Sequence, residues 1–339
     1  MAKKLATGWK ITIIVVSAIL ALILIAVITF FILASIGKSK FHKNDRDISA
    51  SNIEGLEVDD GEVTYNGKKY TLDSDVVSVL FLGVDKDNIG DDFGIGNNGQ
   101  ADTIFVMTLN TATKAIKIIP IPRESMVDVN VFSPSGKYTG TQHEQICLSY
   151  AYGKDANDSS ENTRKSVSRF LLNINVSNYV TMDLKGISAM TDTIGGVSLT
   201  AIEDIPELGC KAGDRLNLNG EKARIYLQSR TEDAEGSSLR MQRQMQFLSE
   251  FASKAGNRIS GNLGLVKTYY DTMKPYISTD LAFSQITYLV STGIAKDLGG
   301  KFDYQMIDGE KKVGEKWVEF YPDPDSLVTA ILNTFYKEK

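Results

Sequence analysis

A charge-free apolar run near the N-terminus constrains the structure of this chain more than any other feature. From Ile11 to Ile36 the sequence contains no charged residue, and the run exceeds the ~20 residues that a helix needs to cross a hydrocarbon core. It has no polar face, which excludes a helix of a soluble domain. A cleaved signal peptide is the alternative, because Ser35 and Gly37 resemble a cleavage site, but its apolar region usually has only ~7–15 residues.

The apolar run divides the chain very unequally. Only a short tail precedes it and no second apolar run follows, so we expect nearly the whole protein on one side of a membrane. Lysines flank the run on both sides, so charge alone barely orients it. We expect a tail at 1–10, a transmembrane helix at 11–36, a juxtamembrane linker with a β-hairpin at 37–74, and a catalytic domain at 75–339 whose core motifs span 75–255.

The charge balance excludes a general nucleic-acid binder. The chain has 37 Lys and Arg against 42 Asp and Glu, and removing the five lysines of the first 40 residues leaves 32 basic against 42 acidic residues. Such a domain lacks the basic excess that neutralises nucleic-acid phosphates, and it would bind an anion only through a few placed groups. Two cysteines exclude a disulfide scaffold. Cys147 and Cys210 form either one disulfide or two buried thiols.

Alternating strand and helix signals predict an α/β fold with a mixed central sheet flanked by helices. Asn66-Gly67 between short alternating runs predicts a type I′ hairpin. Apolar runs predict strands at 76–84, 103–109, 115–121, 179–182 and 317–321. Spacing and capping residues predict helices at 162–172, from Asp183 to Gly195, from Asn219, from Ser237 or Ser238 to about Gly256, and at 325–336.

Two carboxylates occupy strand ends. Asp85 follows the strand at 76–84, and Asp102 begins the next strand. Ligands of open α/β sheets bind beyond the carboxyl ends of strands, and a hairpin-like return would bring Asp102 beside Asp85. Without a His or Cys cluster nearby, the pair suits Mg²⁺, or Mn²⁺, better than zinc. Turn or capping roles are the alternative.

Arginines mark the remaining candidate positions. Arg123 leaves a strand between stiffening prolines, and it would present a bidentate fork to a phosphate or pair with Glu124 or Asp128. Arg240 lies near a helix N-terminus, where a cation opposes the helix dipole unless an anion lies between them. Gln244 shares its face at i+4. Arg230 and Arg243 belong to the same stretch, for which a solvated charged face is the alternative.

Seven segments together resemble the LytR-CpsA-Psr family of membrane-anchored cell-envelope phosphotransferases. They occur in the family's order between about residues 75 and 255. The segments are LFLGVD (80–85), ADTIFVMTLN (101–110), IPIPRES (119–125), SYAYG (149–153), NYVTMDLKGISAMTDTIGGV (178–197), LNGEKARIYLQSR (218–230) and LRMQRQ (239–244).

The resemblance implies a single-pass plasma-membrane protein with a cytoplasmic N-terminus and an extracellular catalytic domain. It would transfer a glycosyl phosphate polymer from a polyprenyl-pyrophosphate carrier to a peptidoglycan sugar hydroxyl. Asp85 and Asp102 would hold Mg²⁺, and either would serve as the general base. Arg123, Arg230, Arg240 and Gln244 would clamp the pyrophosphate, Arg243 would assist or serve the structure, and the lipid tail would lie between the sheet and the helices.

The chain departs from the family pattern at four positions. Gln100 and Gln228 stand where many members have Arg, Glu124 replaces Asp, and Cys147 stands where Asn is common. An amide donates hydrogen bonds without charge, so Gln100 and Gln228 are expected to contact substrate more weakly than Arg. A polyprenyl-pyrophosphate hydrolase and a catalytically weak envelope binding or regulatory protein are the alternatives.

Overall fold

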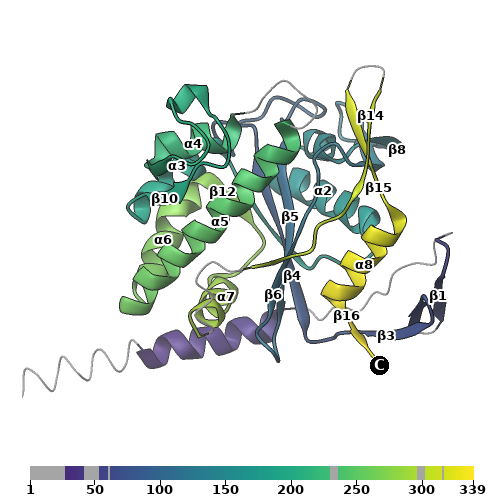
Figure 1. Ribbon diagram of the computed structural model, residues 1–339, viewed down its shortest axis with the longest axis horizontal. Helices are drawn as coiled ribbons and strands as arrows, with labels where there is room; N and C mark the ends of the chain where they lie inside the picture. Colours follow the sequence, from purple (N-terminus) through teal and green to yellow (C-terminus); the bar gives the residue numbers. More distant parts are fainter. Residues whose placement is uncertain (1–26, 42–52, 60–61, 230–235, 296–301, 315–316) are drawn as a thin grey trace, which may run out of the picture.

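A six-stranded sheet forms the centre of the computed structural model (Figure 1). The structure describes residues 27–41, 53–59, 62–229, 236–295, 302–314 and 317–339. The strands in spatial order are β12 (Ile277–Thr279), β9 (Asn178–Met182), β4 (Val76–Val84), β5 (Ala101–Asn110), β6 (Ile116–Pro120) and β13 (Asp303–Tyr304). The β4–β9 and β6–β13 pairs are parallel and the other pairs antiparallel, which confirms the mixed sheet.

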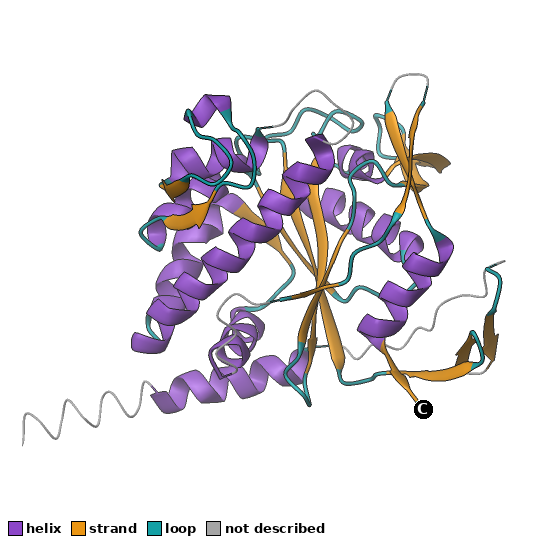
Figure 2. Cartoon of the chain, viewed as in Figure 1, coloured by secondary structure: helices purple, strands orange, loops and turns teal. Residues whose placement is uncertain are grey.

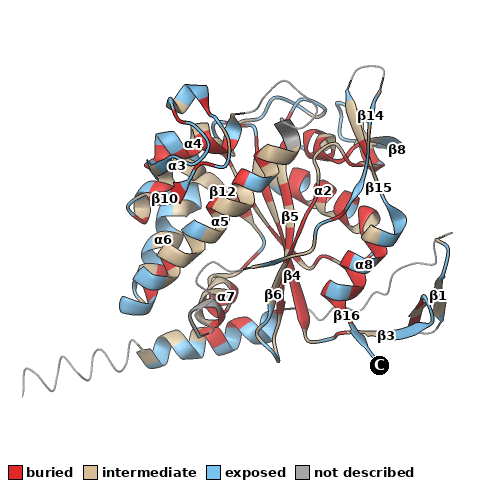
Figure 3. Cartoon of the chain, viewed as in Figure 1, coloured by how far each residue is buried: buried red, intermediate tan, exposed pale blue. Residues whose placement is uncertain are grey.

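One face of this sheet is closed by tight packing. Leu80, Leu82 and Val84 alternate along β4 and are at most 2% exposed, because successive strand side chains point to opposite faces. They share a core with α2 (Ala156–Phe170), α8 (Pro324–Phe335) and the 3₁₀ helix η1 (Ile146–Tyr152). Figure 3 shows the resulting buried band where α8 meets the strands.

The opposite face is covered by a separate group of helices (Figure 2). They are α3 (Leu184–Thr193), α4 (Gly220–Gln228), α5 (Gly236–Gly261), α6 (Leu265–Met273) and α7 (Phe283–Ala295). Tyr226 of α4 and Phe247 of α5 are buried with Ile194 and Leu218 in a second apolar cluster, whose buried members include no residue of the six central strands. The helices therefore stabilise one another and leave room above the sheet.

Side-chain caps fix several helix starts as the sequence predicts. The Asp183 carboxylate accepts from Gly186 N at 2.7 Å, and Asn219 Oδ1 accepts from Lys222 N at 3.0 Å. α2 begins at Ala156, before the predicted 162, because Asp155 caps it and its buried face is largely polar. α5 already includes Gly236 and runs to Gly261, so the predicted caps Ser237 and Ser238 lie within the helix.

The predicted hairpin forms, and it packs with the rest of the molecule. Asn66 (φ 50°) and Gly67 (φ 77°) both have positive φ, as a type I′ turn requires. Val63 is fully buried in the same core as β4. The hairpin belongs to a four-stranded sheet formed by β1 (Leu56–Asp59), β2 (Glu62–Tyr65), β3 (Lys68–Leu72) and the C-terminal β16 (Tyr336–Glu338). The described residues between 53 and 74 therefore form strands and turns of the domain rather than an unstructured linker.

The described part of the chain also contains three further hairpins and two short 3₁₀ helices. The hairpins are β7 (Met126–Phe132) with β8 (Tyr138–Gln145), β10 (Val197–Thr200) with β11 (Arg215–Leu218), and β14 (Gly309–Val313) with β15 (Val318–Pro322). The 3₁₀ helices are η2 (Pro206–Leu208) and η3 (Lys274–Tyr276). The predicted strand at 317–321 thus appears as β15 within one such hairpin.

Residues 27–40 form a helix along the lower edge of the sheet, beside α7 (Figure 1). Ala34 and Phe41 are buried there in a third apolar cluster with Val77 and Tyr288. Residues 37–40, expected in a linker, are helical. No helix among the described residues is both long and apolar enough to cross a bilayer. Most of the run at 11–36 lies outside the described residues.

Candidate active site

A cavity of about 1140 Å³ lies between the central sheet and helices α3, α5 and α6. Its lining changes character along β4: Asp85 stands at the strand end, whereas Phe81 lies four residues earlier. The cavity-lining residues of α5 change in the same way. Arg240 and Gln244 are polar, and Phe251, about three helical turns after Arg240, is apolar. The cavity therefore has a charged end and an apolar end.

A β-bulge directs Asp102 into the charged end. β4 and β5 pair in register up to Gly83 with Thr103, and then Val84 pairs with Ala101, which leaves Asp102 as the extra residue. A bulge breaks the in–out alternation of a strand. Asp102, the extra residue, lines the cavity together with its neighbour Thr103. The sequence contains no signal for this bulge, which arises from the pairing of two strands.

Asp85 is held by the backbone that precedes β5. Its Oδ1 accepts from Gln100 N at 2.5 Å, and Asp85 N donates to Gln100 O at 3.1 Å. Gly99 has φ +86°, and a Cβ there would lie 2.7 Å from Asp85 Oδ1, so glycine leaves room for the carboxylate. Burial raises the pKa of Asp85, and the negative charge of the nearby Asp102 carboxylate raises it further. The hydrogen bond from Gln100 N lowers this pKa in part.

Arg123 donates hydrogen bonds to the side chains of both Asp102 and Gln100. One guanidinium nitrogen donates to Asp102 Oδ1, and the other donates to the Gln100 side-chain oxygen at 2.6 Å. Nε lies 3.7 Å from the Glu124 carboxylate. Asp128, the other partner considered from the sequence, pairs instead with His143. Arg123 is therefore oriented into the cavity, with Gln100 as a neutral partner in place of a second cation.

Arg240 and Gln244 reach the same end from α5. Arg240 Nη1 lies 3.5 Å from Asp102 Oδ2, so Asp102 contacts two arginines. Arg240 is only 6% exposed, which excludes the solvated face considered from the sequence. Gln244 also lines the cavity, and so does Gln228 at the end of α4. Arg240 and Gln244 therefore share one face of α5, as their i, i+4 spacing predicted, and that face lines the cavity.

Arg243 has a structural role and is not part of the cavity wall. It is fully buried, its Nε lies 2.8 Å from Glu203 Oε1, and its guanidinium donates to the carbonyl oxygens of Tyr226 and Ser229. These contacts bind α5 to the end of α4, which favours the structural alternative for Arg243 over the substrate-binding one. Arg230, the remaining candidate, lies outside the described residues.

Cys147 and Cys210 are both free and buried, so the disulfide alternative is wrong. Cys147 Sγ lies 3.9 Å from Gln100 Oε1 and 3.8 Å from Gln145 Oε1. Burial raises the pKa of Cys147 to about 12, and Arg123 opposes this rise. The thiol is therefore protonated at neutral pH and packs behind the charged end.

Asp85 and Asp102 provide a donor set that suits a hard divalent cation. Within the described ranges, no group of three or more His, Cys, Asp or Glu side chains is arranged to hold a metal ion. Mg²⁺ is commonly held by one or two protein carboxylates, with water and substrate phosphate completing its octahedron. The two carboxylates of neighbouring strand ends fit that mode and do not fit a closed structural zinc site.

The apolar end is made by side chains that sequence patterns did not single out. Phe81 and Phe105 stack with ring centroids 5.0 Å apart on the sheet side. The opposite walls carry Leu184, Ile187, Met190, Phe247, Phe251 and Met273. Trp317 and Gln145 were also missed, because β7–β8 and β14–β15 bring them to the cavity from distant parts of the chain.

Sequence comparison shows similarity to transferases of the bacterial cell envelope. The chain is 28% identical over 243 residues to the polyisoprenyl-teichoic acid–peptidoglycan teichoic acid transferase TagU of Bacillus subtilis (strain 168), a match covering 70% of this chain and 71% of TagU. It is 26% identical over 236 residues to TagV of the same strain, covering 65% of this chain and 55% of TagV. The chain thus spans only about half the length of TagV.

Solved structures have the same fold. B. subtilis TagV superimposes with a TM-score of 0.61 at 22% identity, covering 76% of this chain and 95% of TagV. TagT bound to LI-WTA gives a TM-score of 0.58 at 22% identity, covering 77% of this chain and 91% of TagT. The family model described as the LytR_cpsA_psr family matches residues 34–317. Because this match includes most of the chain and both strand ends of the cavity, the protein belongs to the LytR-CpsA-Psr family.

Proposed function

We propose that this protein transfers a glycosyl phosphate polymer from a polyprenyl-pyrophosphate carrier to a sugar hydroxyl of peptidoglycan. The cavity carries this proposal, because its charged end and its apolar end match the two halves of an amphiphile with a diphosphate head and a hydrocarbon tail. The names of the relatives, which are teichoic acid transferases, support the polymer and the acceptor. TagT bound to LI-WTA supports a wall polymer as the ligand class.

The charged end supplies what phosphoryl transfer requires. The acceptor hydroxyl attacks the phosphorus that bears the glycan, the bond to the bridging oxygen breaks, and the prenyl phosphate leaves with the bridging electron pair. Charge spreads over the phosphoryl oxygens during this step, so positioned cations lower the barrier. Arg123 and Arg240 converge there, and Asp85 and Asp102 are the carboxylates available to accept the hydroxyl proton.

Magnesium dependence is part of the proposal. Asp85 and Asp102 would hold the ion, and the ion would neutralise pyrophosphate charge and stabilise the leaving group. Arg123 and Arg240, which both contact Asp102, would also be placed to bind the phosphate oxygens. Gln100, Gln228 and Gln244 would donate amide hydrogen bonds without adding charge.

We further propose that the run at 11–36 anchors the protein in the plasma membrane, with residues 1–10 in the cytoplasm and the cavity outside the cell. The length of the uncharged run supports the anchor. A carrier lipid and a wall acceptor would both be accessible on that side. The acidic region after residue 40 would then bind its anionic substrate through local contacts rather than through its net field.

Transfer is tested with the purified full chain, a polyprenyl-pyrophosphate-linked glycan and peptidoglycan fragments. Arg123→Ala and Arg240→Ala are each expected to reduce transfer by about 10²–10³-fold, the usual effect of removing a group that stabilises transition-state charge. Arg258→Ala is the matched control, because Arg258 lies exposed in the last turn of the helix that carries Arg240. EDTA should abolish transfer and Mg²⁺ should restore it.

The products distinguish the alternatives. A phosphodiester between glycan and peptidoglycan supports the transferase, whereas free glycosyl phosphate without any acceptor identifies a hydrolase. Tight binding without either product identifies a binding protein. Unchanged transfer by folded Arg123→Ala and Arg240→Ala chains would contradict the assignment of the cavity as the active site.

A further inference from the structure

The helix at 27–40 has two different long faces. Ala34, Gly37 and Phe41 recur at helical spacing and are buried against the domain. Phe41 packs on Tyr288 of α7 with ring centroids 6.1 Å apart. A side chain on Gly37 would collide with the backbone carbonyl of Ser284, so α7 and the helix touch through their backbones. This contact is close and depends on glycine.

The other face exposes an apolar stripe, which we define as Ile28, Phe31, Ile32 and Ile36. These side chains are 49%, 59%, 53% and 44% exposed. Exposed apolar groups that adjoin one another mark a surface for a partner of low polarity. The stripe continues the charge-free run that starts at Ile11, which identifies the partner as the acyl chains of a bilayer.

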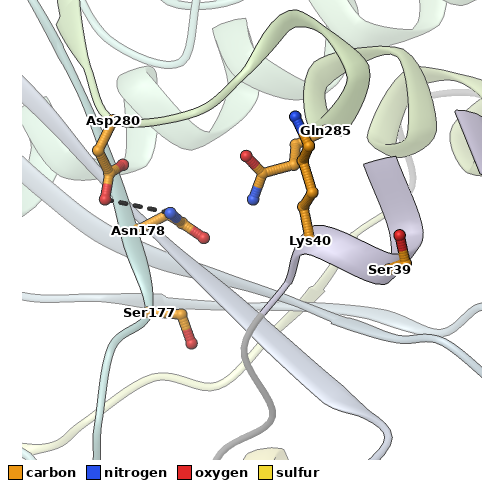
Figure 4. A pocket seen from close by; sticks show the side chains of 6 residues that line it. All are labelled: Ser39, Lys40, Ser177, Asn178, Asp280 and Gln285. Atoms are coloured by element: carbon orange, nitrogen blue, oxygen red, sulfur yellow. Dashed lines mark hydrogen bonds between the residues drawn. The ribbon is translucent and has the colours of Figure 1, made fainter. Parts of the chain in front are cut away.

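A polar junction ends the stripe. Ser39 and Lys40 border a second cavity of about 560 Å³ together with Asn178, Asp280 and Gln285 (Figure 4). The Asp280 carboxylate accepts from Asn178 Nδ2 at 3.1 Å. A change from apolar to charged side chains within one turn is typical of a helix leaving the hydrocarbon core at the headgroup level. Lys38 and Lys40 thus lie where anionic headgroups would be.

The packed face of the helix connects to the active-site cavity. The cluster that buries Ala34 and Phe41 contains Val77 and Val79 of β4, and Phe81 packs against it. Phe81 also lines the apolar end of the cavity. Along β4 the order is therefore helix contact, apolar end and Asp85, over about 26 Å from Val77 to Asp85 at ~3.3 Å per residue.

We propose that the helix at 27–40 is a rigid part of the domain whose lipid-facing stripe fixes the apolar end of the cavity against the bilayer, so that a prenyl chain passes from lipid into the cavity beside this helix. The ligand in this proposal rests on the proposed function, whereas the membrane contact rests on the exposed stripe and on the charge-free run that it continues. The carrier thus need not leave the membrane fully, and its diphosphate reaches Asp85 while its tail end remains in lipid.

Photo-crosslinking tests the two faces of the helix separately. Benzoylphenylalanine is placed at Phe31 or at Phe41 in the full chain reconstituted in phosphatidylglycerol vesicles. Position 31 should give lipid adducts, and position 41, which is only 7% exposed, should give an intrachain adduct with α7. No lipid adduct at position 31, or equal lipid adducts at both positions, would overturn the proposal.

A matched pair of variants tests the coupling to the cavity. Gly37→Leu separates the helix from α7, whereas Ser35→Leu adds the same side chain on the exposed side. Gly37→Leu should weaken binding of undecaprenyl pyrophosphate in vesicles by about tenfold, because a positioned entrance is lost. Binding of farnesyl pyrophosphate in solution should change less than about twofold, because this ligand does not enter from the membrane and so does not need the positioned entrance. Ser35→Leu should change neither.

The outcomes separate this inference from the proposed function. Unchanged vesicle binding by Gly37→Leu would overturn the inference, and so would equal losses for both prenyl pyrophosphates. Failure of the unmodified chain to bind farnesyl pyrophosphate would contradict the proposed function instead. Lipid adducts at position 31 would still support the membrane contact in that case.

Discussion

The two faces of the central sheet are built from alternate residues of the same strands and have opposite properties. On β4, Leu80, Leu82 and Val84 are almost completely buried under α2 and α8. Phe81 alternates with them, Asp85 follows Val84 at the strand end, and both line the cavity under α3, α5 and α6, which Leu82 and Val84 also border. One face is packed for stability, and the other retains space for a ligand.

Helix α5 shows the same contrast within one turn. Arg240 faces the cavity and lies near Asp102, whereas Arg243 is enclosed by Glu203 and the end of α4. The two arginines are close in sequence, yet Arg240 lines the cavity and Arg243 joins α5 to the end of α4. Sequence proximity therefore does not predict role, and each arginine must be tested by the property it controls.

The largest effect is expected for Arg243→Ala. Removing one partner of a buried ion pair leaves Glu203 uncompensated and costs about 3–5 kcal/mol of unfolding free energy. Arg240→Ala should cost much less stability, because Arg123 still pairs with Asp102, while transfer falls. Urea unfolding and transfer assays on both variants measure the contrast. A stable Arg243→Ala chain with lost transfer would place Arg243 in the site and reverse our assignment.

The next effect separates the two faces of β4. Leu80→Ala should cost about 3 kcal/mol, since it leaves a void in a packed core. Phe81→Ala should cost less, because its ring already borders a cavity, although it loses the stack on Phe105. Binding of a prenyl pyrophosphate should weaken only in Phe81→Ala, and inorganic pyrophosphate should bind both variants alike. Equal losses of stability would show that the cavity collapses in solution.

Gly99→Ala tests how the charged end is supported. Its φ of +86° and the 2.7 Å approach of a Cβ to Asp85 predict a cost of about 1–3 kcal/mol, as for other strained backbone positions. Gly90→Ala in the same loop is the control, because nothing lies within 4 Å of a Cβ there. Mg²⁺ affinity, measured by calorimetry, should fall only in Gly99→Ala. Equal effects would assign the loss to the loop as a whole.

Local signals in the sequence were sufficient for much of the fold. The apolar run of β4, the turn at Asn66-Gly67 and the caps Asp183 and Asn219 were predicted because each depends on a few consecutive residues. The start of α2 was missed, since a buried face made of Ser, Thr and Asn gives no apolar period. Helix 27–40 was expected to end in a linker from residue 37, but packing on α7 extends it.

The site was predictable in its charged residues and not in its shape. Asp85, Asp102, Arg123, Arg240 and Gln244 were expected together, and the structure brings them to one cavity. Each of these residues lies in a short sequence motif, so the sequence is sufficient to identify them. The bulge that turns Asp102 inward and the contacts that remove Arg243 from the wall depend on partners far away in the chain. Long-range pairing decides both.

The smallest effect concerns the boundary between the packed core and the cavity, where the buried Cys147 lies beside Arg123. Burial holds the pKa of this thiol at about 12, and the thiolate is the species that reacts with iodoacetamide. At pH 8 the folded chain should therefore be labelled at neither Cys147 nor Cys210, both of which are buried. In urea without reductant both thiols should react, because neither is in a disulfide.

Mass spectrometry after labelling measures this difference for each cysteine separately. Rapid labelling of Cys147 in the folded chain would mean that water reaches the back of the charged end, so the packed face would not extend there. Missing labels in urea would indicate a disulfide. Protection of Cys147 in the folded chain, with labelling of both thiols in urea, would show that the packed core extends to Arg123, which donates to Asp102. Packed side chains rather than solvent would then hold the Arg123 guanidinium in place.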